Sequence, residues 1–319
     1  MRVLIMGAGA LGSVLGGFLA KAGYDVTLVG RATHMDAIRR SGLLITGIFG
    51  EHRVTENLTP VTAVDEADSG AFDTVFITVK SYDTGAAVGA VAPVVGEDTL
   101  VCSYQNGLGN AEIIAARFGW PRTIGARAIY GVWLPEPGRA EVTVIASPTA
   151  LGVYDPATPV DRVKTLAAGM DAAGLPTVFT ERFATLLWAK VAYNCALNPL
   201  SALLDAPYGR LLDTEETRAM MREVVEELYA VGRAMDVELE PADAAEYNRY
   251  LVEDLIPPTA RHYASMREDF RLKRRTEIGA LNEAIVRFGE QHGIQCPANA
   301  FLSRLIRARE TLYLSERES

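Results

Sequence analysis

A lysine and two asparagines occupy one stripe of an otherwise apolar segment. The segment WAKVAYNCALNPLSALL runs from Trp188 to Leu204, and Lys190, Asn194 and Asn198 stand in it at positions i, i+4 and i+8. If the segment is helical, this spacing puts the three side chains on the same face. A buried lysine needs a partner, and buried amides need several hydrogen bonds. The stripe therefore predicts a polar pocket for a ligand; the alternative is a lysine whose long side chain reaches solvent.

A serine and a glutamate further along the chain are candidates for the same pocket. SMRE, which starts at Ser265, has the capping-box pattern, so a helix is expected to begin just after Ser265 and to run to Gly293. In that helix Glu277 shares a face with small and apolar residues, which favours an inward carboxylate. We expect Glu277 to be the partner of Lys190. The alternatives are that Glu277 is surface charge and that Ser265 is only a helix cap.

A glycine-rich turn near the N-terminus indicates a dinucleotide site. GAGALG follows the apolar run Arg2–Met6, which suits a buried parallel strand, and precedes a segment with helical spacing. In that context Gly7 allows the turn, Gly9 lets a pyrophosphate approach the backbone, and Gly12 lets the helix pack on the strand. The predicted cofactor contacts of this turn are Gly7, Ala8, Gly9, Ala10, Leu11 and Gly12.

The end of the second predicted strand, Asp25–Gly30, is expected to select the dinucleotide. The strand is followed by Arg31 and not by an acidic residue. A carboxylate there would hold a ribose diol, whereas a guanidinium suits a 2′-phosphate through charge-assisted hydrogen bonds. We therefore predict NADP(H) rather than NAD(H), with an ordinary surface arginine as the alternative.

Further strand-like runs alternate with loops and helical stretches through the first half of the chain, at Phe72–Val79, Thr99–Tyr104 and Thr123–Ile129. This alternation is typical of an α/β, doubly wound parallel sheet of the Rossmann type, which binds ligands at the carboxyl ends of its strands. Lys80 and Asn106 fall at such ends. Lys80 is expected to contact a cofactor phosphate or ribose. Asn106 suits the nicotinamide side or the substrate, although an Asn-Gly pair also suits a plain turn.

Strand-like sequence continues to Thr180 and then gives way to helices. We therefore predict residues 1–180 as an NADP-binding domain and residues 181–319 as an all-helical, substrate-binding and catalytic domain. A length of 319 residues fits two domains. Pro199 lacks an amide hydrogen and is expected to bend or interrupt the helix that carries Lys190, just after Asn198.

The overall composition limits the partners. A net charge of −9 argues against nucleic acid, and the basic run Arg271–Arg275 suits a solvated helix face. Three separated cysteines fit neither a disulfide framework nor a metal site and favour a reducing compartment. The uncharged stretch Val3–Ala20 fits a strand, turn and helix better than a membrane span, because glycines interrupt it. We expect a cytoplasmic protein without membrane partners; a homodimer and a monomer both fit the sequence.

On these residues the sequence resembles the ketopantoate reductases (2-dehydropantoate 2-reductases), over nearly its whole length. The resemblance rests on GAGALG, VKSYDT, QNGLGN, WAKVAYNCALNPLSAL, SM with a following acid, and RRTEI. It implies NADPH-dependent reduction of the 2-oxo acid 2-dehydropantoate to (R)-pantoate, a step toward pantothenate and coenzyme A. It also implies a Rossmann-type domain followed by a helical domain, with the site in the cleft between them.

The resemblance further implies a role for each polar residue. Lys190 is the implied general acid. Glu277 is implied as a second catalytic residue, which helps to position both cofactor and substrate. The other implied contacts are Asn194, Asn198 and Ser265 on the substrate, Asn106 between cofactor and substrate, and Arg31 and Lys80 at the phosphate end of NADPH.

Three features depart from the family pattern. Gly279 stands where the family usually has an acid, Tyr208 stands near a position where some members have a substrate-binding asparagine, and Ile129–Val132 differs from the common form. A related reductase of another 2-oxo acid is therefore an alternative. A non-catalytic NADP(H)-binding sensor is a second, but a sensor has no need of a proton donor beside the nicotinamide.

Overall fold

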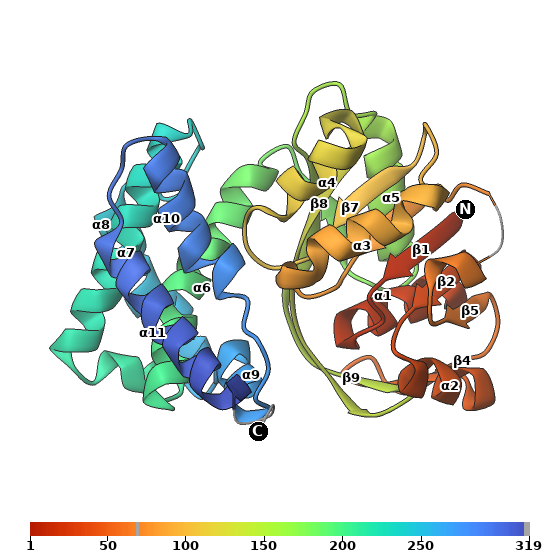
Figure 1. Cartoon of the computed structure of the whole chain (residues 1–319), viewed down its shortest axis with the longest axis horizontal. Helices are drawn as coiled ribbons and strands as arrows, with labels where there is room; N and C mark the ends of the chain where they lie inside the picture. The colour runs from red at the N-terminus through yellow and green to blue at the C-terminus, as the bar shows by residue number, and fades with distance from the viewer. Residues whose placement is uncertain (68–69, 316–319) are drawn as a thin grey trace. The chain divides into compact units, whose positions relative to one another are not determined.

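The computed structural model describes residues 1–67 and 70–315, and the chain divides into two compact units (Figure 1). Unit 1 comprises residues 1–105 and 110–183, and unit 2 comprises residues 106–109 and the chain from Ala184 onward. The domain ranges expected from the sequence, 1–180 and 181–319, stay a proposal, and they do not single out residues 106–109.

Unit 1 is built on one ten-stranded sheet in the order β4-β3-β9-β8-β7-β6-β1-β2-β5, with β10 beside β9. The stretch from β5 to β8 is parallel throughout. The strands are β1 (Arg2–Met6), β2 (Asp25–Val29), β3 (Leu43–Gly47), β4 (His52–Val54), β5 (Leu58–Val61), β6 (Thr74–Ile77), β7 (Leu100–Ser103), β8 (Thr123–Glu136), β9 (Arg139–Val153) and β10 (Thr177–Phe179). The predicted α/β class with a largely parallel sheet is confirmed.

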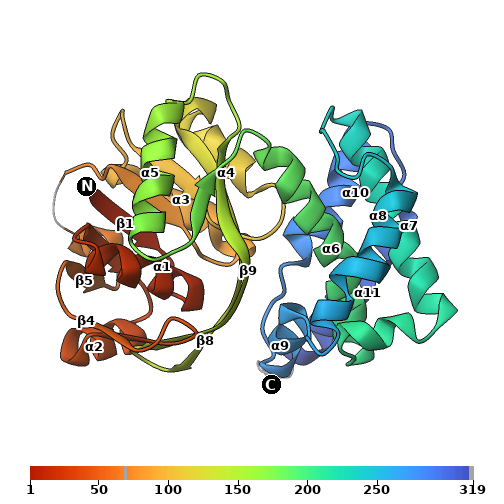
Figure 2. The ribbon, with the colours of Figure 1, turned by 180° about the vertical axis from the view of Figure 1, so that it is seen from behind.

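Helices cover both faces of this sheet, because its central strands are apolar on both sides. In β1, Val3 and Ile5 join the core with α1 and α5, whereas Leu4 joins the core with α3 and α4. Figure 1 shows α3 in front of the sheet, and Figure 2, from behind, shows α5 in front. The helices of unit 1 are α1 (Ala10–Lys21), α2 (Ala32–Ser41), α3 (Thr84–Val91), α4 (Asn110–Phe118) and α5 (Val160–Ala172), with short helical turns η1 (Val64–Glu66), η2 (Ser81–Asp83), η3 (Ala92–Val94) and η4 (Trp120–Arg122).

Two strands are much longer than the sequence indicated. The predicted run Thr123–Ile129 is only the first half of β8, which forms one antiparallel hairpin with β9. The middle of the hairpin is partly exposed and its register shifts at several points, so it lacks a regular alternation of buried residues. Its turn is tied to α2, because the Gly138 N–H donates to Nδ1 of His34 at 2.9 Å.

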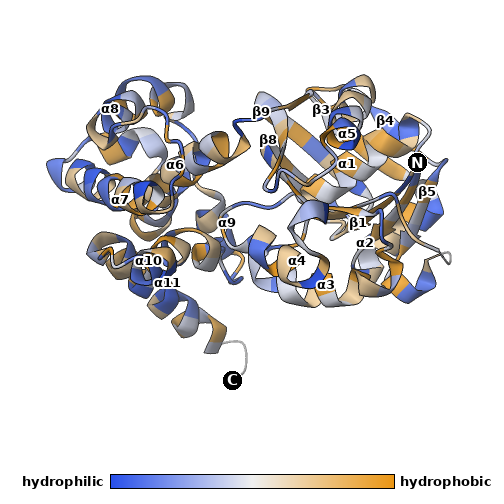
Figure 3. Ribbon diagram, turned by 90° about the horizontal axis from the view of Figure 1, so that it is seen from above, coloured by the Kyte–Doolittle hydropathy of each residue, from blue (hydrophilic) through white to orange (hydrophobic). Residues whose placement is uncertain are grey.

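Unit 2 is helical, as predicted. Its elements are α6 (Phe183–Leu204, which begins at the last residue of unit 1), η5 (Tyr208–Leu212), α7 (Glu215–Ala234), α8 (Ala244–Tyr250), the π-helical turn η6 (Leu251–Leu255), η7 (Pro257–Thr259), α9 (Ser265–Arg271), η8 (Ile278–Ala280), α10 (Asn282–Gln291) and α11 (Pro297–Ser315). Figure 3 shows hydrophobic and hydrophilic residues alternating along α10 and α11, as in helices with one buried face.

Of the two outcomes expected at Pro199, the interruption of α6 is wrong, because the helix continues to Leu204, whereas the bend stays a prediction. Pro199 cannot donate the usual hydrogen bond to the carbonyl four residues earlier, that of Cys195. The side chain of Asn282 supplies the missing donor: its Nδ2 lies 3.1 Å from the Cys195 oxygen. The same Nδ2 donates to Oδ1 of Asn299 at 2.9 Å, and both asparagines are fully buried. A partner distant in sequence therefore keeps α6 whole.

The single helix expected from Ser265 to Gly293 is also wrong. The chain leaves α9 after Arg271, passes through Lys273 at a φ of 49°, and starts α10 only at Asn282. Ser265 is the first helical residue and its side chain caps nothing, so the capping box does not form. The basic run Arg271–Arg275 is exposed as expected, but only its first residue is helical.

The sequence leads us to expect neither a membrane span nor a metal site. None of the described helices is both long and apolar enough to cross a membrane. Across the described part of the chain no group of three or more His, Cys, Asp or Glu side chains is arranged to hold a metal ion. Cys102, Cys195 and Cys296 are buried free thiols.

Candidate active site

Three predicted cofactor contacts share one edge of the sheet in unit 1. Gly7 follows β1, Arg31 follows β2 after one residue, and Lys80 follows β6 after two. These strands are parallel neighbours in the order β6-β1-β2. The carboxyl ends of the strands therefore bring the glycine turn, Arg31 and Lys80 to the same side, where open α/β sheets bind ligands.

Two glycines of GAGALG, Gly7 and Gly12, are required by close contacts. Gly7 has a φ of +113°, and a Cβ there would lie 2.6 Å from the Val79 nitrogen. A Cβ at Gly12 would lie 2.4 Å from the Gly7 oxygen. Gly9 is exposed, and a Cβ there would meet nothing closer than 4.0 Å. The space over Gly9 at the start of α1 is thus open to a phosphate group, and the helix N-terminus presents amide donors there.

Arg31 is exposed and stands directly before the first turn of α2. Among the described residues its guanidinium has no hydrogen-bond or ion-pair partner. Lys80 is partly buried and precedes the turn η2. Both cations therefore stand at the ligand-binding edge of the sheet, on the two strands that flank β1.

Two side chains that the sequence did not indicate, Thr78 and Gln105, support this edge of the sheet. The Thr78 hydroxyl donates to the Gly7 oxygen at 2.8 Å and so holds the glycine turn against β6. The Gln105 amide donates to the Val79 oxygen at 2.9 Å and to the Thr84 hydroxyl at 2.8 Å. Gln105 directly precedes the QNGLGN asparagine in the chain. Its position directly before the Asn-Gly pair is the only feature of the sequence that points to Gln105.

In unit 2 the Lys190 ammonium donates a hydrogen bond of 2.7 Å to Oδ1 of Asn106. Asn106 belongs to the short segment 106–109, which is part of unit 2. Next to it, the Leu108 N–H donates to the Ala280 oxygen at 2.7 Å. Gly107 has a φ of +86°, and a Cβ there would lie 2.2 Å from the same oxygen. The turn η8 therefore fixes the segment that holds the acceptor of Lys190.

The two asparagines of the stripe differ in their partners. Asn198 is buried, and its Oδ1 accepts a hydrogen bond of 2.8 Å from the Tyr208 hydroxyl. Asn194 is partly buried and has no partner among the described residues. Burial raises the pKa of Tyr208 far above its usual range, with a smaller contribution from Tyr193. The Tyr208 hydroxyl therefore keeps its proton and acts as a donor.

The remaining predicted site residues, Ser265 and Glu277, belong to unit 2. Ser265 is exposed at the start of α9, where the preceding Ala264 N–H donates to the Ser201 hydroxyl of α6 at 3.2 Å. Glu277 is 8% exposed, and its carbonyl accepts from the Ala280 N–H at 3.0 Å. The predicted pairing of the Glu277 carboxylate with Lys190 stays a prediction.

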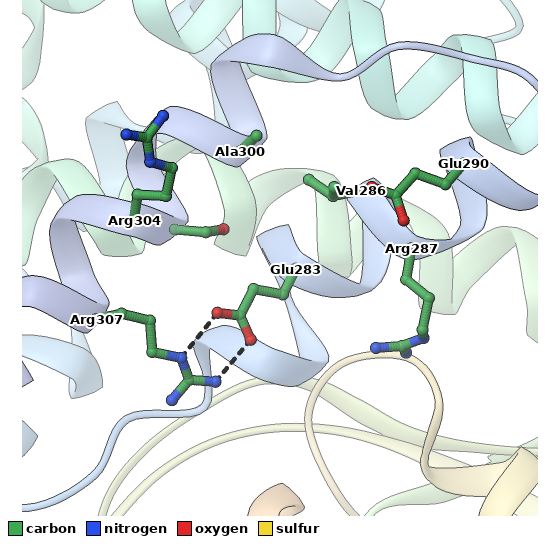
Figure 4. Close-up of a pocket in the computed structure, with 8 residues that line it drawn as sticks. Glu283, Val286, Arg287, Glu290, Ala300, Arg304 and Arg307 are labelled. Atoms are coloured by element: carbon green, nitrogen blue, oxygen red, sulfur yellow. Dashed lines mark hydrogen bonds and ion pairs between the residues drawn. The ribbon is translucent and has the colours of Figure 1, made fainter.

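Next to η8 lies a cluster of charged side chains formed by Arg307, Glu283 and Glu310. Arg307 donates to both oxygens of Glu283, at 2.7 and 2.6 Å (Figure 4), and it also donates to Glu310 at 2.9 Å. Glu310 in turn accepts from the Thr276 N–H at 2.6 Å. A Cβ at Gly279 would lie 3.1 Å from the Arg307 guanidinium. Position 279, which lacks the acid usual in the family, thus faces an arginine that Glu283 and Glu310 already neutralise.

Comparison with known proteins gives a consistent result over the whole chain. Two protein-family models match: Ketopantoate reductase PanE/ApbA over residues 3–156, and Ketopantoate reductase PanE/ApbA C terminal over residues 182–310. The 2-dehydropantoate 2-reductase of Aquifex aeolicus (strain VF5) is 37% identical, with 99% of each chain covered.

Solved structures agree with this result. The PanE/ApbA family ketopantoate reductase from Ralstonia eutropha JMP134 is 34% identical, with a TM-score of 0.87 and coverage of 98% of this chain and 100% of that one. D-mandelate dehydrogenase with NADH and anilino(oxo)acetate is 25% identical, with a TM-score of 0.85 and coverage of 98% and 99%. The family resemblance expected from the sequence is confirmed.

Proposed function

The chain belongs to the ketopantoate reductase family of NAD(P)-dependent oxidoreductases, and we propose that it reduces 2-dehydropantoate to (R)-pantoate with NADPH. The observation that carries the proposal is the polar stripe of α6. Lys190 lies in the largely apolar helix α6 and donates a hydrogen bond of 2.7 Å to Oδ1 of Asn106. In the cell, the reaction belongs to the route to pantothenate and coenzyme A.

The proposed chemistry needs a proton donor at the reacting oxygen. NADPH, held by the GAGALG turn, would supply a hydride to C2 of the 2-oxo acid. As the C2–O π bond breaks, its electron pair goes to the oxygen, and Lys190 neutralises that oxygen and delivers a proton from Nζ. A positioned acid of this kind contributes roughly 10²–10⁴-fold in rate. Asn106 keeps the ammonium in a defined direction, while Asn194, Asn198, Ser265 and Glu277 position the substrate.

NADPH is the proposed cofactor because of Arg31. Among the described residues its guanidinium has no partner, and it follows β2, where folds of this type bind the adenosine ribose of a dinucleotide. The GAGALG turn would hold the pyrophosphate, and Lys80 would contact the phosphate end. The structure of D-mandelate dehydrogenase was determined with NADH, which makes NADH the alternative cofactor.

A second candidate is the reduction of another 2-oxo acid. D-mandelate dehydrogenase, with its bound anilino(oxo)acetate, supports it, as does an aromatic cluster beside Asn198. In that cluster the rings of Tyr193 and Tyr208 lie 5.7 Å apart at 87°, and the His262 ring lies 5.3 Å from Tyr208. Such a wall would suit an aromatic or branched substrate.

A substrate panel tests the proposal. Purified protein is mixed with NADPH and 2-dehydropantoate, or with other 2-oxo acids, and the absorbance of the reduced cofactor is followed. We expect the highest kcat/KM with 2-dehydropantoate. Turnover only with other acids would favour the second candidate. Binding of NADPH without any turnover would contradict both and favour a sensor.

Location and assembly are also proposals. Three buried thiols without a disulfide support a reducing, cytoplasmic location. Light scattering of the purified protein would distinguish a homodimer from a monomer.

A further inference from the structure

We propose that Tyr208 fixes the amide of Asn198 so that its Nδ2 hydrogens meet the substrate, and that this selects 2-oxo acids carrying a hydrogen-bond acceptor away from the reacting carbonyl. This inference rests on the proposed function, since it concerns the substrate of the same site. Tyr208 would be a positioning residue that determines specificity through Asn198.

The Tyr208 hydroxyl has a fixed place. The backbone N–H of Tyr208 donates to the His262 oxygen at 3.0 Å, and the Gly209 N–H donates to the Ala260 oxygen at 2.9 Å. The ring packs edge-on against Tyr193 and is 3% exposed. These contacts hold the hydroxyl 2.8 Å from Oδ1 of Asn198.

This hydrogen bond sets the polarity of the Asn198 amide. The protonated tyrosine donates and Oδ1 accepts, so the NH₂ group points to the other side of the planar amide. Within the described residues Nδ2 has no protein partner. It is also not fully enclosed by protein atoms. Asn198 therefore presents two donor hydrogens to accessible space.

Such donors discriminate between substrates. An acceptor on the ligand satisfies them, whereas a hydrocarbon group would leave them unpaired, which is unfavourable in a largely buried place. Asn198 stands two helical turns from Lys190, so it meets a part of the ligand remote from the protonated carbonyl. The terminal hydroxyl of 2-dehydropantoate is an acceptor of this kind. Without Tyr208 the amide could reverse, and the preference would weaken.

The test compares 2-dehydropantoate with 3,3-dimethyl-2-oxobutanoate, which lacks only the hydroxyl. In Tyr208→Phe we expect the KM for 2-dehydropantoate to rise about tenfold, the equivalent of one hydrogen bond, with kcat within about twofold. The KM for the dehydroxylated acid should stay unchanged. The ratio of the two kcat/KM values should therefore fall about tenfold.

Two further variants make the test specific. Tyr193→Phe removes the neighbouring hydroxyl, which bonds to Thr259 at 2.8 Å and not to Asn198, and it should keep the ratio. Asn198→Ala should lose the preference as Tyr208→Phe does, and adding Tyr208→Phe to it should have no further effect on the ratio. Asn198→Ala leaves the packing of Tyr208 in place, so it serves if Tyr208→Phe fails to fold.

The outcomes separate the two proposals. Turnover by the natural protein with an unchanged ratio in Tyr208→Phe or Asn198→Ala would overturn the role of Tyr208 alone. An equal loss for both acids would also overturn it, because it would mean a general structural defect. No reduction of either acid by the natural protein would overturn the proposed function and this inference with it.

Discussion

Among single residues, Lys190 and Arg31 illustrate how local chemistry can indicate a site. The sequence predicted both because each breaks a local rule: a cation in an apolar helix, and a cation at a strand end where a ribose-binding acid is common. The hydrogen-bond partner of Lys190 could not be predicted in the same way. Asn106, which lies 84 positions from Lys190 in the chain, accepts its hydrogen bond, and no pattern within α6 indicates that contact.

Arg31→Ala should weaken NADPH binding far more than NADH binding. Loss of a charged hydrogen bond of about 1.5–3 kcal/mol corresponds to a Kd for NADPH about 10- to 100-fold higher. The measurement is titration of each cofactor by fluorescence. Arg40→Ala, at an exposed position of α2, the helix that begins directly after Arg31, is the matched control and should leave both Kd values unchanged. Equal weakening of the two cofactors by Arg31→Ala would show that Arg31 does not read the 2′-phosphate.

At the scale of elements, the segment 106–109 shows how a turn can position the hydrogen-bond acceptor of Lys190. Gly107→Ala should lower the free energy of unfolding by about 2–5 kcal/mol, from backbone strain and overpacking against the Ala280 oxygen. It should also lower kcat, because Asn106 moves with the segment. Chemical denaturation and steady-state kinetics provide the two readouts.

Gly109→Ala is the control for that substitution. Gly109 also has a positive φ, +90°, but a Cβ there would meet only the end of the flexible Arg287 side chain. Its cost should stay near the strain of the backbone alone, about 1–2 kcal/mol. Similar losses of kcat in both variants would argue against a special role for the contact with η8.

The continuity of α6 makes a second prediction about elements. Asn282→Ala removes the donor to the Cys195 oxygen and should destabilise the protein by about 1–3 kcal/mol. With Pro199→Ala the helix regains a backbone donor for that oxygen, so the cost of Asn282→Ala should fall by about 1 kcal/mol in this background. Asn299→Ala, which leaves the bond from Asn282 to Cys195 in place, should cost the same in both backgrounds. If the effects of Pro199→Ala and Asn282→Ala on the free energy of unfolding are additive, the Asn282 side chain does not replace the missing backbone donor.

These elements also show where sequence patterns fail. Pro199 predicts a break from local rules, but a buried asparagine from α10 replaces the missing donor. SMRE predicts a cap and a long helix, but the chain turns away after Arg271, where the Thr276 N–H bonds to the Glu310 carboxylate instead of a helical carbonyl. In both cases a tertiary partner distant in sequence outweighs the local propensity.

For the whole molecule, the sequence predicted the order of the two kinds of structure because their periodicities differ clearly. The central strands read as buried runs, and the second half reads as amphipathic helices. It did not predict that residues 106–109 belong to unit 2, since that assignment depends on contacts with η8. The match of family models to both halves agrees with the observed succession of an α/β unit and a helical unit.

The role of Lys190 in proton delivery is tested most directly by amine rescue of Lys190→Ala, with 2-dehydropantoate and NADPH and with cofactor absorbance as the readout. We predict that kcat falls roughly 10²–10⁴-fold, that the Kd for NADPH barely changes, and that ethylammonium restores part of the rate in proportion to its concentration. Lys164→Ala, at an exposed position of α5, should behave as the natural protein does. Full turnover by Lys190→Ala without added amine would contradict the account.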